Sequence, residues 1–344
     1  QVYAYSVLVN TFGDIPYSES LDINNPQPKY DDAKTVTLDL LSRLDTDIAA
    51  MNGDADGFGT ADIIYGGNVG KWQKFANSLR LKLAMVIADV DPGTAGAKIA
   101  ASAALPLITA NADNALFKYV GAPNNNPLSN DVPPRSARQD FVMANTLVDE
   151  MNTLNDPRRA AYFTTVGGEY VGGKYGFSNV YANFSTFSTK VTATTFPGNM
   201  LDASEVNFLL AEAVERGFIT GDAKSYYDAA ITASLAYWGV TGVEDYLAQA
   251  TVDYSNAGSG ASWQEKIGTQ KWIALYNRGF DAWTEWRRLD FPVLVAPDAS
   301  GVPPIPKRLI YPIIENSLNA ANTKAAAAAI GGDDSATRLF WDVK

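Results

Sequence analysis

The sequence predicts a mainly α-helical protein with an irregular, loop-rich region that carries a few short strands. Apolar residues recur at helical spacing in several long segments, and Asp or Ser residues that can cap a helix precede many of these segments. In contrast, residues 162–197 are rich in Gly, Ser, Thr, Asn and aromatic residues and show no period of 3.6. The periodic segments therefore predict helices, and this stretch predicts the irregular region.

Four helices are expected in the first part of the chain. Residues 1–12 resemble the end of an amphipathic helix, with Val2, Tyr5, Leu8 and Val9 on one face. The other three are expected at about 32–51, 71–91 and 94–104. Asp31 or Asp32 can cap the second helix, and Pro92 is expected to end the third. Between the helices, Asn and Pro residues at 24–28 favour a loop.

The pattern loosens after residue 105 and becomes helical again near residue 200. A strand is expected at 115–120, a long loop at 123–134 and a helix at about 138–154. Further helices are expected to start after Asp202, Asp222, Ser262 and Gly279, and a turn of surface helix is expected at the alanine run 325–329. The helices after Asp202 and Asp222 are joined by a short Gly-containing turn. They would form a helical hairpin, the unit of tetratricopeptide arrays.

Tryptophans at helical spacing are expected in the core. Trp72, Trp272 and Trp283 each recur with other apolar residues in this way. The neighbouring Arg287 and Arg288 are expected to satisfy backbone carbonyls or carboxylates near the end of their helix.

The composition narrows the range of functions. The chain has 344 residues, a net charge of −11, no cysteine and no histidine. The negative charge argues against nucleic acid as a partner, because phosphate would be repelled. Without Cys and His, thiolate nucleophiles, imidazole bases and His or Cys metal ligands are excluded, whereas hydrolysis by paired carboxylates is not. No run of about 18 apolar residues is present, so no membrane-spanning helix is expected.

Several ordered motifs are similar to those of the SusD/RagB-like nutrient-binding outer-membrane lipoproteins. The motifs are ADIIYGG and KWQKFANSL at 61–79, NDPR at 155–158, ASEV and LAEA at 203–213, QKWIAL at 270–275, WTEWRR at 283–288, and YP at 311–312 with Glu315 and Asn316. The resemblance covers nearly the whole chain. It implies one SusD/RagB-like domain over residues 1–344, with a tetratricopeptide-like helical superstructure. The helical halves would lie at about 1–105 and 200–344, and a loop-rich region at about 106–200.

The resemblance also implies a function. Members of this family are lipid-anchored at the cell surface of the outer membrane, where they bind a nutrient, typically an oligosaccharide. They deliver it to a TonB-dependent transporter barrel of the SusC type, and they are not enzymes. The export signal, the lipidated cysteine and the first helical pairs of the family do not occur in this sequence. We therefore expect that its N-terminal part is missing and that membrane contact is made only through a lipid anchor absent from this chain.

Aromatic residues in irregular segments are the candidates for ligand binding. Sugar C–H faces stack on aromatic rings, while amides and carboxylates bind the hydroxyls. The candidates are Tyr170, Tyr175, Phe177, Asn179, Tyr181, Asn183, Phe184, Tyr254 and Trp263. The alternative for each ring is that it seals a loop onto the helical body.

A calcium site is a second hypothesis. Asn52, Asp54 and Asp56 place oxygens at alternate positions before Gly57, as in the first half of a calcium-binding loop. The twelfth position, where a bidentate Glu is expected, holds Ile63, and Asp62 precedes it. The alternative is a polar Asx turn after a helix. No other cofactor is expected.

Two further functions remain open. A helical-repeat scaffold could bind peptides or proteins on its concave surface, with the aromatic loops serving as packing. A carboxylate-based glycoside hydrolase would need a pair such as Glu205 and Glu212, although a salt-bridged pair is the simpler interpretation. Binding screens separate a glycan-binding protein from the scaffold, and release of reducing sugar would identify the hydrolase.

Overall fold

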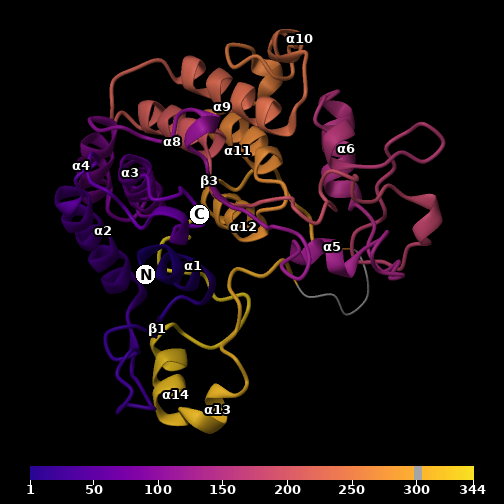
Figure 1. The fold of residues 1–344 in the computed structure, drawn as a ribbon. Helices are drawn as coiled ribbons and strands as arrows, with labels where there is room; N and C mark the ends of the chain where they lie inside the picture. The colour runs from indigo at the N-terminus through magenta and orange to yellow at the C-terminus, as the bar shows by residue number, and fades with distance from the viewer. Residues whose placement is uncertain (298–303) are drawn as a thin grey trace.

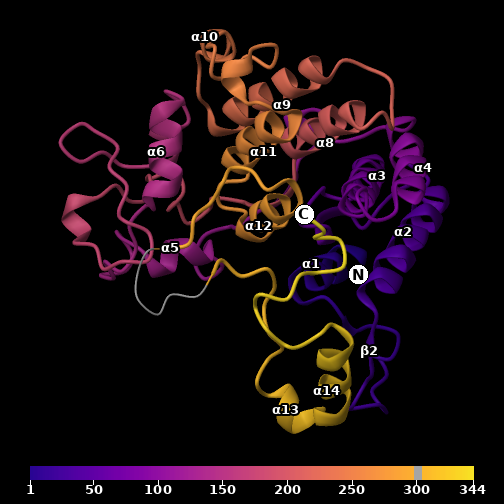
Figure 2. The ribbon, with the colours of Figure 1, turned by 180° about the vertical axis from the view of Figure 1, so that it is seen from behind.

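The computed structural model describes residues 1–297 and 304–344. Within them the fold is mainly helical, with two antiparallel sheets of two strands each. Figure 1 shows a helical body, a loop-rich region beside it that contains α6 (Asn145–Thr153), and a lobe below with α13 (Glu315–Leu318) and α14 (Ala320–Ala329). Seen from behind in Figure 2, both ends of the chain lie in the body. None of the helices in the described part is long and apolar enough to cross a membrane.

Three of the first four helices begin at capping side chains, and the first has no such cap. The four are α1 (Val2–Phe12), α2 (Ala33–Ala50), α3 (Val69–Val86) and α4 (Pro92–Ala103). The side chains of Asp32, Asn68 and Asp91 each accept a backbone N–H from the first turn of the following helix. The sequence predicted that Pro92 would end α3, but α3 ends at Val86 and Pro92 is the first residue of α4. A proline costs no hydrogen bond at this position, because the first N–H groups of a helix have no partner within it. Leu8 is exposed and does not share the buried face of α1.

The second group of helices is built around α8. It comprises α8 (Ala203–Glu215), α9 (Ala223–Trp238), α10 (Val243–Leu247), α11 (Trp263–Ala274) and α12 (Gly279–Leu289). Helices α8 and α9 form the expected hairpin, and α8 also contacts α3 and α11. Val206 and Leu209 belong to a core with the N-terminal helices, whereas Phe208 belongs to a core with α9 and α11. A helix that is apolar on both faces is buried, and α8 joins the two cores.

The remaining elements are short. Strand β1 (Ile15–Pro16) pairs with β2 (Tyr30–Asp31), and β3 (Ala115–Phe117) pairs with β4 (Gly198–Leu201). The short helices not yet named are α5 (Pro127–Asp131), α7 (Arg159–Tyr162), and the 3₁₀ turns Gly59–Ala61, Asn111–Asp113, Tyr181–Asn183 and Ala257–Ser259.

Three expectations for the middle of the chain were inaccurate. The strand at 115–120 stops at Phe117, the loop at 123–134 contains α5, and α6 begins at Asn145 rather than Arg138. Residues 162–197 form isolated bridges rather than ladders, so this segment is held by side chains and single backbone contacts.

The tryptophans expected in the core are only partly buried. Trp72 and Trp272 pack against the edges of the two cores, and the indole N–H of Trp283 donates to the carbonyl of Pro306 at 2.9 Å. The deeply buried ones are Trp238 and Trp341. Helical spacing identifies the face of a helix that is apolar, but not how completely a second element covers it.

A buried ionic network ties α8, α11 and α12 together. Arg288 donates through Nη2 to Oε2 of Glu212 at 2.5 Å and to Oε2 of Glu285 at 2.6 Å. Lys271 donates to Glu285 at 2.7 Å, and all four side chains are buried. Burial acts to raise the pKa of both carboxyls, but the attraction of Arg288 and its neighbours holds the pKa of each below its usual range. The expectation of a carboxylate partner for Arg288 is confirmed.

The lobe below the body joins a loop near the start of the chain to a segment near its end. The side-chain amide of Gln27 donates to the carbonyl of Leu318 at 2.8 Å, and that of Asn319 donates to the carbonyl of Pro28 at 2.8 Å. The hydroxyl of Tyr30 donates to Glu315 at 2.9 Å. Segments almost 300 residues apart in sequence therefore depend on each other for their hydrogen bonds.

Candidate ligand-binding site

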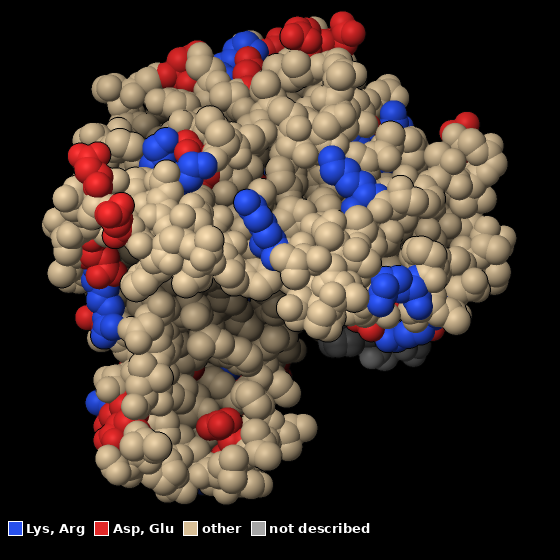
Figure 3. Space-filling model, in the orientation of Figure 1, with Lys and Arg blue, Asp and Glu red and all other residues tan. Residues whose placement is uncertain are grey.

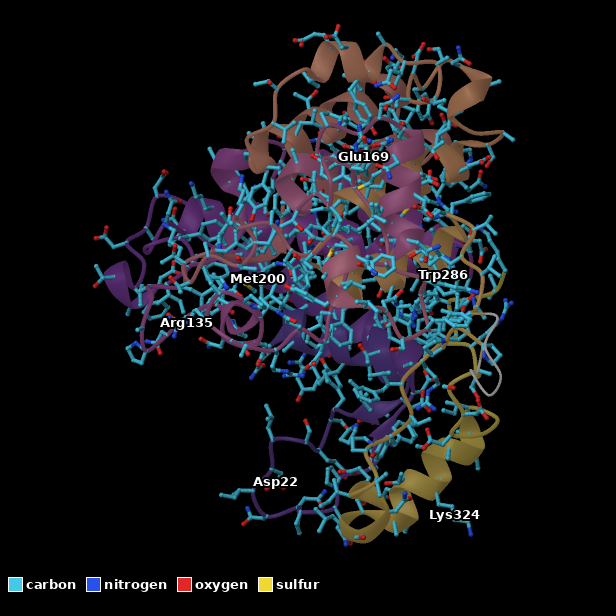
Figure 4. The ribbon with its side chains drawn as sticks, turned by 90° about the vertical axis from the view of Figure 1, so that its right-hand side faces the viewer. Asp22, Arg135, Glu169, Met200, Trp286 and Lys324 are labelled. Atoms are coloured by element: carbon cyan, nitrogen blue, oxygen red, sulfur yellow. The ribbon has the colours of Figure 1, made fainter. Side chains whose placement is uncertain are left out.

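A cleft of about 280 Å³ lies beside the first turns of α6, and we call it the α6 cleft. Three separate segments line it: the start of α6, the loop that carries Tyr175, and the chain after α12. The lining residues are Asn145, Thr146, Glu150, Lys174, Tyr175 and 292–297. Figure 4 views the molecule from the side of the loop-rich region, in which Arg135 and Glu169 are labelled.

The α6 side of the cleft is polar. Thr146 and Glu150 lie one helical turn apart, so their side chains share a face. The side-chain oxygen of Asn145 accepts the N–H of Tyr175 at 3.0 Å, and none of the residues that the structure describes accepts from its amide NH₂ group. Burial, and then the nearby charge of Glu265, raises the pKa of the Glu150 carboxyl above its usual value.

The loop with Tyr175 is held tightly against α6. A Cβ on Gly172 would lie 2.4 Å from the Cα of Asn145, and the N–H of Asn145 donates to the carbonyl of Gly173 at 2.8 Å. Only glycine at 172 allows this approach of the two backbones. The contact presents Tyr175 to the cleft with 40% of its surface exposed.

Asn179 and Phe177 complete the loop without lining the cleft. The side-chain oxygen of Asn179 accepts the N–H of Lys174 at 2.9 Å, and its NH₂ donates to the carbonyl of Phe177 at 2.8 Å. The Lys174 ammonium lies 3.8 Å from the centre of the Phe177 ring. Asn179 is therefore a brace for the loop, and Phe177 forms a partly exposed platform under a cation.

The third wall of the cleft is apolar. Val293 and Val295 are each 73% exposed, which is unusual for a run of aliphatic residues. Pro297 closes this wall against the loop, because a Cβ on Gly176 would lie 2.4 Å from the Cβ of Pro297. Gly176 has φ of +78°, a second reason why a side chain is disfavoured there.

The α6 cleft combines features that suit a neutral, polyhydroxylated ligand. An exposed phenol ring and two valines offer apolar contact, while the amide of Asn145, the hydroxyl of Thr146 and the carboxyl of Glu150 offer hydrogen bonds. In Figure 3, basic and acidic side chains are scattered among large uncharged areas. That face shows no field of a single sign that would favour a strongly charged ligand.

The other aromatic candidates are not gathered at the cleft. The ring of Tyr170 packs against that of Phe163, with 6.4 Å between the ring centres. Tyr181 lines a separate hollow of about 10 Å³. Phe184 is partly buried, and Asn183 is exposed at the end of a 3₁₀ turn. Among the candidates named from the sequence, Tyr175 is the one that lines the α6 cleft.

Tyr254 and Trp263 pack against α8 and α9 instead. The hydroxyl of Tyr254 donates to Glu215 at 2.7 Å, and its ring centre lies 4.9 Å from that of Tyr227. The Arg216 guanidinium lies 5.2 Å from the Trp263 ring centre. These contacts match the alternative in which a ring seals a loop onto the helical body.

The segment proposed for calcium contains turns held by its own side chains. The side-chain oxygen of Asn52 accepts the N–H of Asp54 at 3.1 Å, which is an Asx turn. Asp62 accepts three backbone N–H groups and the indole N–H of Trp72. Burial opposes these bonds, yet they lower the pKa of the Asp62 carboxyl. No group of three or more acidic side chains in residues 1–297 and 304–344 is arranged to hold a metal ion. Calcium binding stays a prediction.

The carboxylates considered as a glycosidase pair are engaged in ion pairs. Glu205 is buried, accepts a hydrogen bond from Arg278 at 2.5 Å and forms an ion pair with Lys82 at 2.8 Å. Glu212 is held by Arg288 and Arg216. Because the pKa of Glu212 lies below its usual value, it is a poor general acid. The simpler interpretation of a salt-bridged pair is confirmed.

Sequence reasoning missed most of the residues that line the cleft. Thr146 and Glu150 stand at a spacing of four, a signal that is common on solvated helix faces and so carries little information alone. The aliphatic run between Pro292 and Pro297 was a stronger signal, because it belongs to no periodic segment.

Comparison with known proteins identifies the family. The family model described as "Starch-binding associating with outer membrane", of the SusD-like type, matches residues 1–312. The chain belongs to the SusD-like family. This confirms the resemblance of its motifs and the mainly helical fold class. The family consists of binding proteins associated with the outer membrane. No curated protein matches the chain.

Solved structures of SusD homologues share the fold of this SusD-like chain. A homologue from Bacteroides uniformis is 32% identical, with a TM-score of 0.88 over 99% of this chain and 79% of its own. One from Bacteroides thetaiotaomicron is 30% identical, with a TM-score of 0.84 over 100% of this chain and 80% of its own. A chitin-binding homologue from Flavobacterium johnsoniae is 29% identical, with a TM-score of 0.86 over 98% of this chain and 78% of its own.

Proposed function

We propose that this SusD-like protein binds an oligosaccharide in the α6 cleft at the cell surface and delivers it to a TonB-dependent transporter of the SusC type. The observation that carries the proposal is the exposed ring of Tyr175 beside the amide NH₂ of Asn145 and the carboxyl of Glu150. A sugar ring has apolar C–H faces and a rim of hydroxyl groups, so it needs both kinds of contact from a protein.

The polar groups of the cleft complement a sugar hydroxyl in both directions. The NH₂ of Asn145 donates, the carboxylate of Glu150 accepts, and the hydroxyl of Thr146 can do either. The loop is already fixed by Asn179 and by the approach of Gly172 to α6, so little conformational entropy is lost when a ligand binds. The chitin-binding character of two similar structures supports a glycan as the ligand.

The transporter and the lipid anchor are parts of the same proposal. The outer-membrane association of the family supports a place beside an importer. We propose that the protein acts as a binding partner without catalysis, and the ion-paired state of Glu205 and Glu212 supports this. Co-purification with a TonB-dependent barrel from the native membrane would test the partner. Release of reducing sugar by the purified protein would contradict the absence of catalysis.

Calorimetric titration tests the cleft directly. The purified chain is titrated with malto-, cello- and chito-oligosaccharides, and Tyr175→Ala is then compared on the best ligand. Loss of the ring should weaken binding at least about fivefold, since a stacked ring contributes on the order of 1 kcal/mol beyond its area. Phe58→Ala is the matched control, because Phe58 is 88% exposed and lies outside the cleft.

Thermal melts separate a binding defect from a folding defect. Both variants should melt within about 2 °C of the wild type, because surface substitutions change stability little. Equal ligand affinity of Tyr175→Ala and wild type would place the site elsewhere. If no oligosaccharide binds the intact chain, the proposal fails, and peptides become the next ligands to screen.

A further inference from the structure

A second, smaller pocket lies at the junction of β4, the end of α9 and the end of α11. Its volume is about 40 Å³, and it shares no lining residue with the α6 cleft. The lining residues are 196–199, Asp202, Tyr237, Trp238, Ala274 and 276–278. Figure 4 labels the neighbouring Met200 in the helical body, well above the lobe that contains Asp22 and Lys324. The exposed Asn277 places part of the lining at the protein surface.

Three polar atoms of residues that line this pocket are buried without a hydrogen-bond partner in the described part of the chain. They are Nη1 of Arg278, which forms only an ion pair with Oδ2 of Asp202 at 3.4 Å, the hydroxyl of Tyr237 and Oδ1 of Asn199. Buried polar atoms of this kind are rare in folded proteins unless a water or a ligand pairs with them. Arg278 is only 7% exposed, so bulk water does not solvate its guanidinium.

The rest of each polar side chain is fixed. Nη2 of Arg278 donates to Glu205 at 2.5 Å, and the NH₂ of Asn199 donates to Asp202 at 2.6 Å. The remaining atoms therefore present a donor at Arg278 and an acceptor at Asn199. Burial raises the pKa of the Tyr237 hydroxyl to about 12, so this group also keeps its proton and can donate.

The other wall is aromatic. The rings of Phe196 and Trp238 are stacked with 5.5 Å between centres, and Tyr276 lies 5.7 Å from Trp238. The charge of Arg278 is already balanced by Glu205, Asp281 and Asp202, so the pocket does not favour an anion. It is an apolar surface with two donors and one acceptor beside it.

We infer that this pocket binds the acetamido group of an N-acetylated sugar. The carbonyl oxygen would accept from Arg278 and Tyr237, the N–H would donate to Asn199, and the methyl group would contact the aromatic wall. A volume of 40 Å³ holds roughly three water-sized groups, which suits an acetamido substituent and excludes a whole sugar ring. The inference rests on the proposed glycan binding and narrows its substrate class.

Two trisaccharides that differ in this group test the inference. The β-1,4-linked trimer of N-acetylglucosamine and cellotriose share a backbone, but cellotriose has a hydroxyl where the other has the acetamido group. Titration of the intact chain should give at least about tenfold tighter binding of the acetylated trimer. Tyr237→Phe removes the unpaired hydroxyl and keeps the ring, so it should reduce that preference at least about threefold and leave the cellotriose affinity unchanged.

The outcomes separate this inference from the proposed function. Equal affinity for the two trimers, together with binding that Tyr175→Ala weakens, would overturn the acetamido pocket and leave the α6 cleft standing. If Tyr237→Phe keeps the full preference for the acetylated trimer, the inference is also overturned, and the unpaired atoms of the pocket bind only ordered water. A chain that binds no oligosaccharide would refute both. The thermal melt of Tyr237→Phe should match the wild type, because the hydroxyl makes no hydrogen bond with residues 1–297 or 304–344.

Discussion

Replacing Arg288 with Met should be among the most damaging single changes in the helical body. The substitution keeps an unbranched side chain of similar length and removes the guanidinium between Glu212 and Glu285. Breaking a buried ion pair by removing one partner costs about 3–5 kcal/mol, because the other charge stays buried without compensation. Glu212 keeps Arg216 at 2.7 Å and Glu285 keeps Lys271 at 2.7 Å, so we expect the lower end, about 3 kcal/mol.

Urea unfolding measures this loss through the midpoint of the transition. Arg43→Met is the matched control, because the Arg43–Asp39 pair is about half exposed on both sides and should contribute only about 0.3–0.5 kcal/mol. Adding Glu212→Gln to Arg288→Met should cost less than the sum of the single changes, with a coupling of about 1 kcal/mol or more. If the free energies of unfolding of Arg288→Met and Arg43→Met differ by less than about 1 kcal/mol, the network does not stabilise the fold as argued.

Three further predictions concern the pH dependence of the network, the 52–62 segment and Gly172. The carboxyls of Glu212 and Glu285 both have pKa values below the ordinary 4.5. The stability that they add is therefore present above pH 4.5 and is lost as the pH falls. The melting temperature of the wild type should drop more steeply in acid than that of the Arg288→Met variant. If the 52–62 segment binds calcium, a chelator lowers the wild-type melting temperature and leaves Asp54→Ala unchanged, and a wild-type melt that ignores the chelator rejects the site. Gly172→Ala would force its Cβ to 2.4 Å from the Cα of Asn145, so it should cost about 1–3 kcal/mol and weaken glycan binding, whereas Gly93→Ala, which meets no close atom, should cost nothing.

Local signals in the sequence predicted the helices well where a capping side chain stood next to a periodic segment. Asp32, Asp202 and Asp222 cap α2, α8 and α9 as expected, because capping depends only on neighbouring residues. Glu205 stands three residues after Asp202, the spacing of a capping box, but its side chain does not bond back to the N–H of Asp202. It turns instead to Lys82 and Arg278, partners that lie far away in sequence.

The ligand site could be predicted only in part, because its walls come from three separate segments. Tyr175 was identified since an aromatic residue in a Gly-rich stretch is a local feature. Asn145 and Glu150 were missed because nothing in a helical sequence shows which solvated face a distant loop will approach. The expectations for Tyr254 and Trp263 remain untested by any ligand, but their contacts with Glu215 and Arg216 are those of packing residues.

The lobe that joins Gln27 and Pro28 to Leu318 and Asn319 has a consequence for the order in which the molecule is made. A ribosome releases residue 28 long before it has added residue 319, so the early loop waits for its partners until synthesis is almost complete. Closing such a long stretch of chain is slow compared with forming a single helix. The growing polypeptide should therefore stay open at this end, and a chain truncated before α13 should be an easy target for proteases.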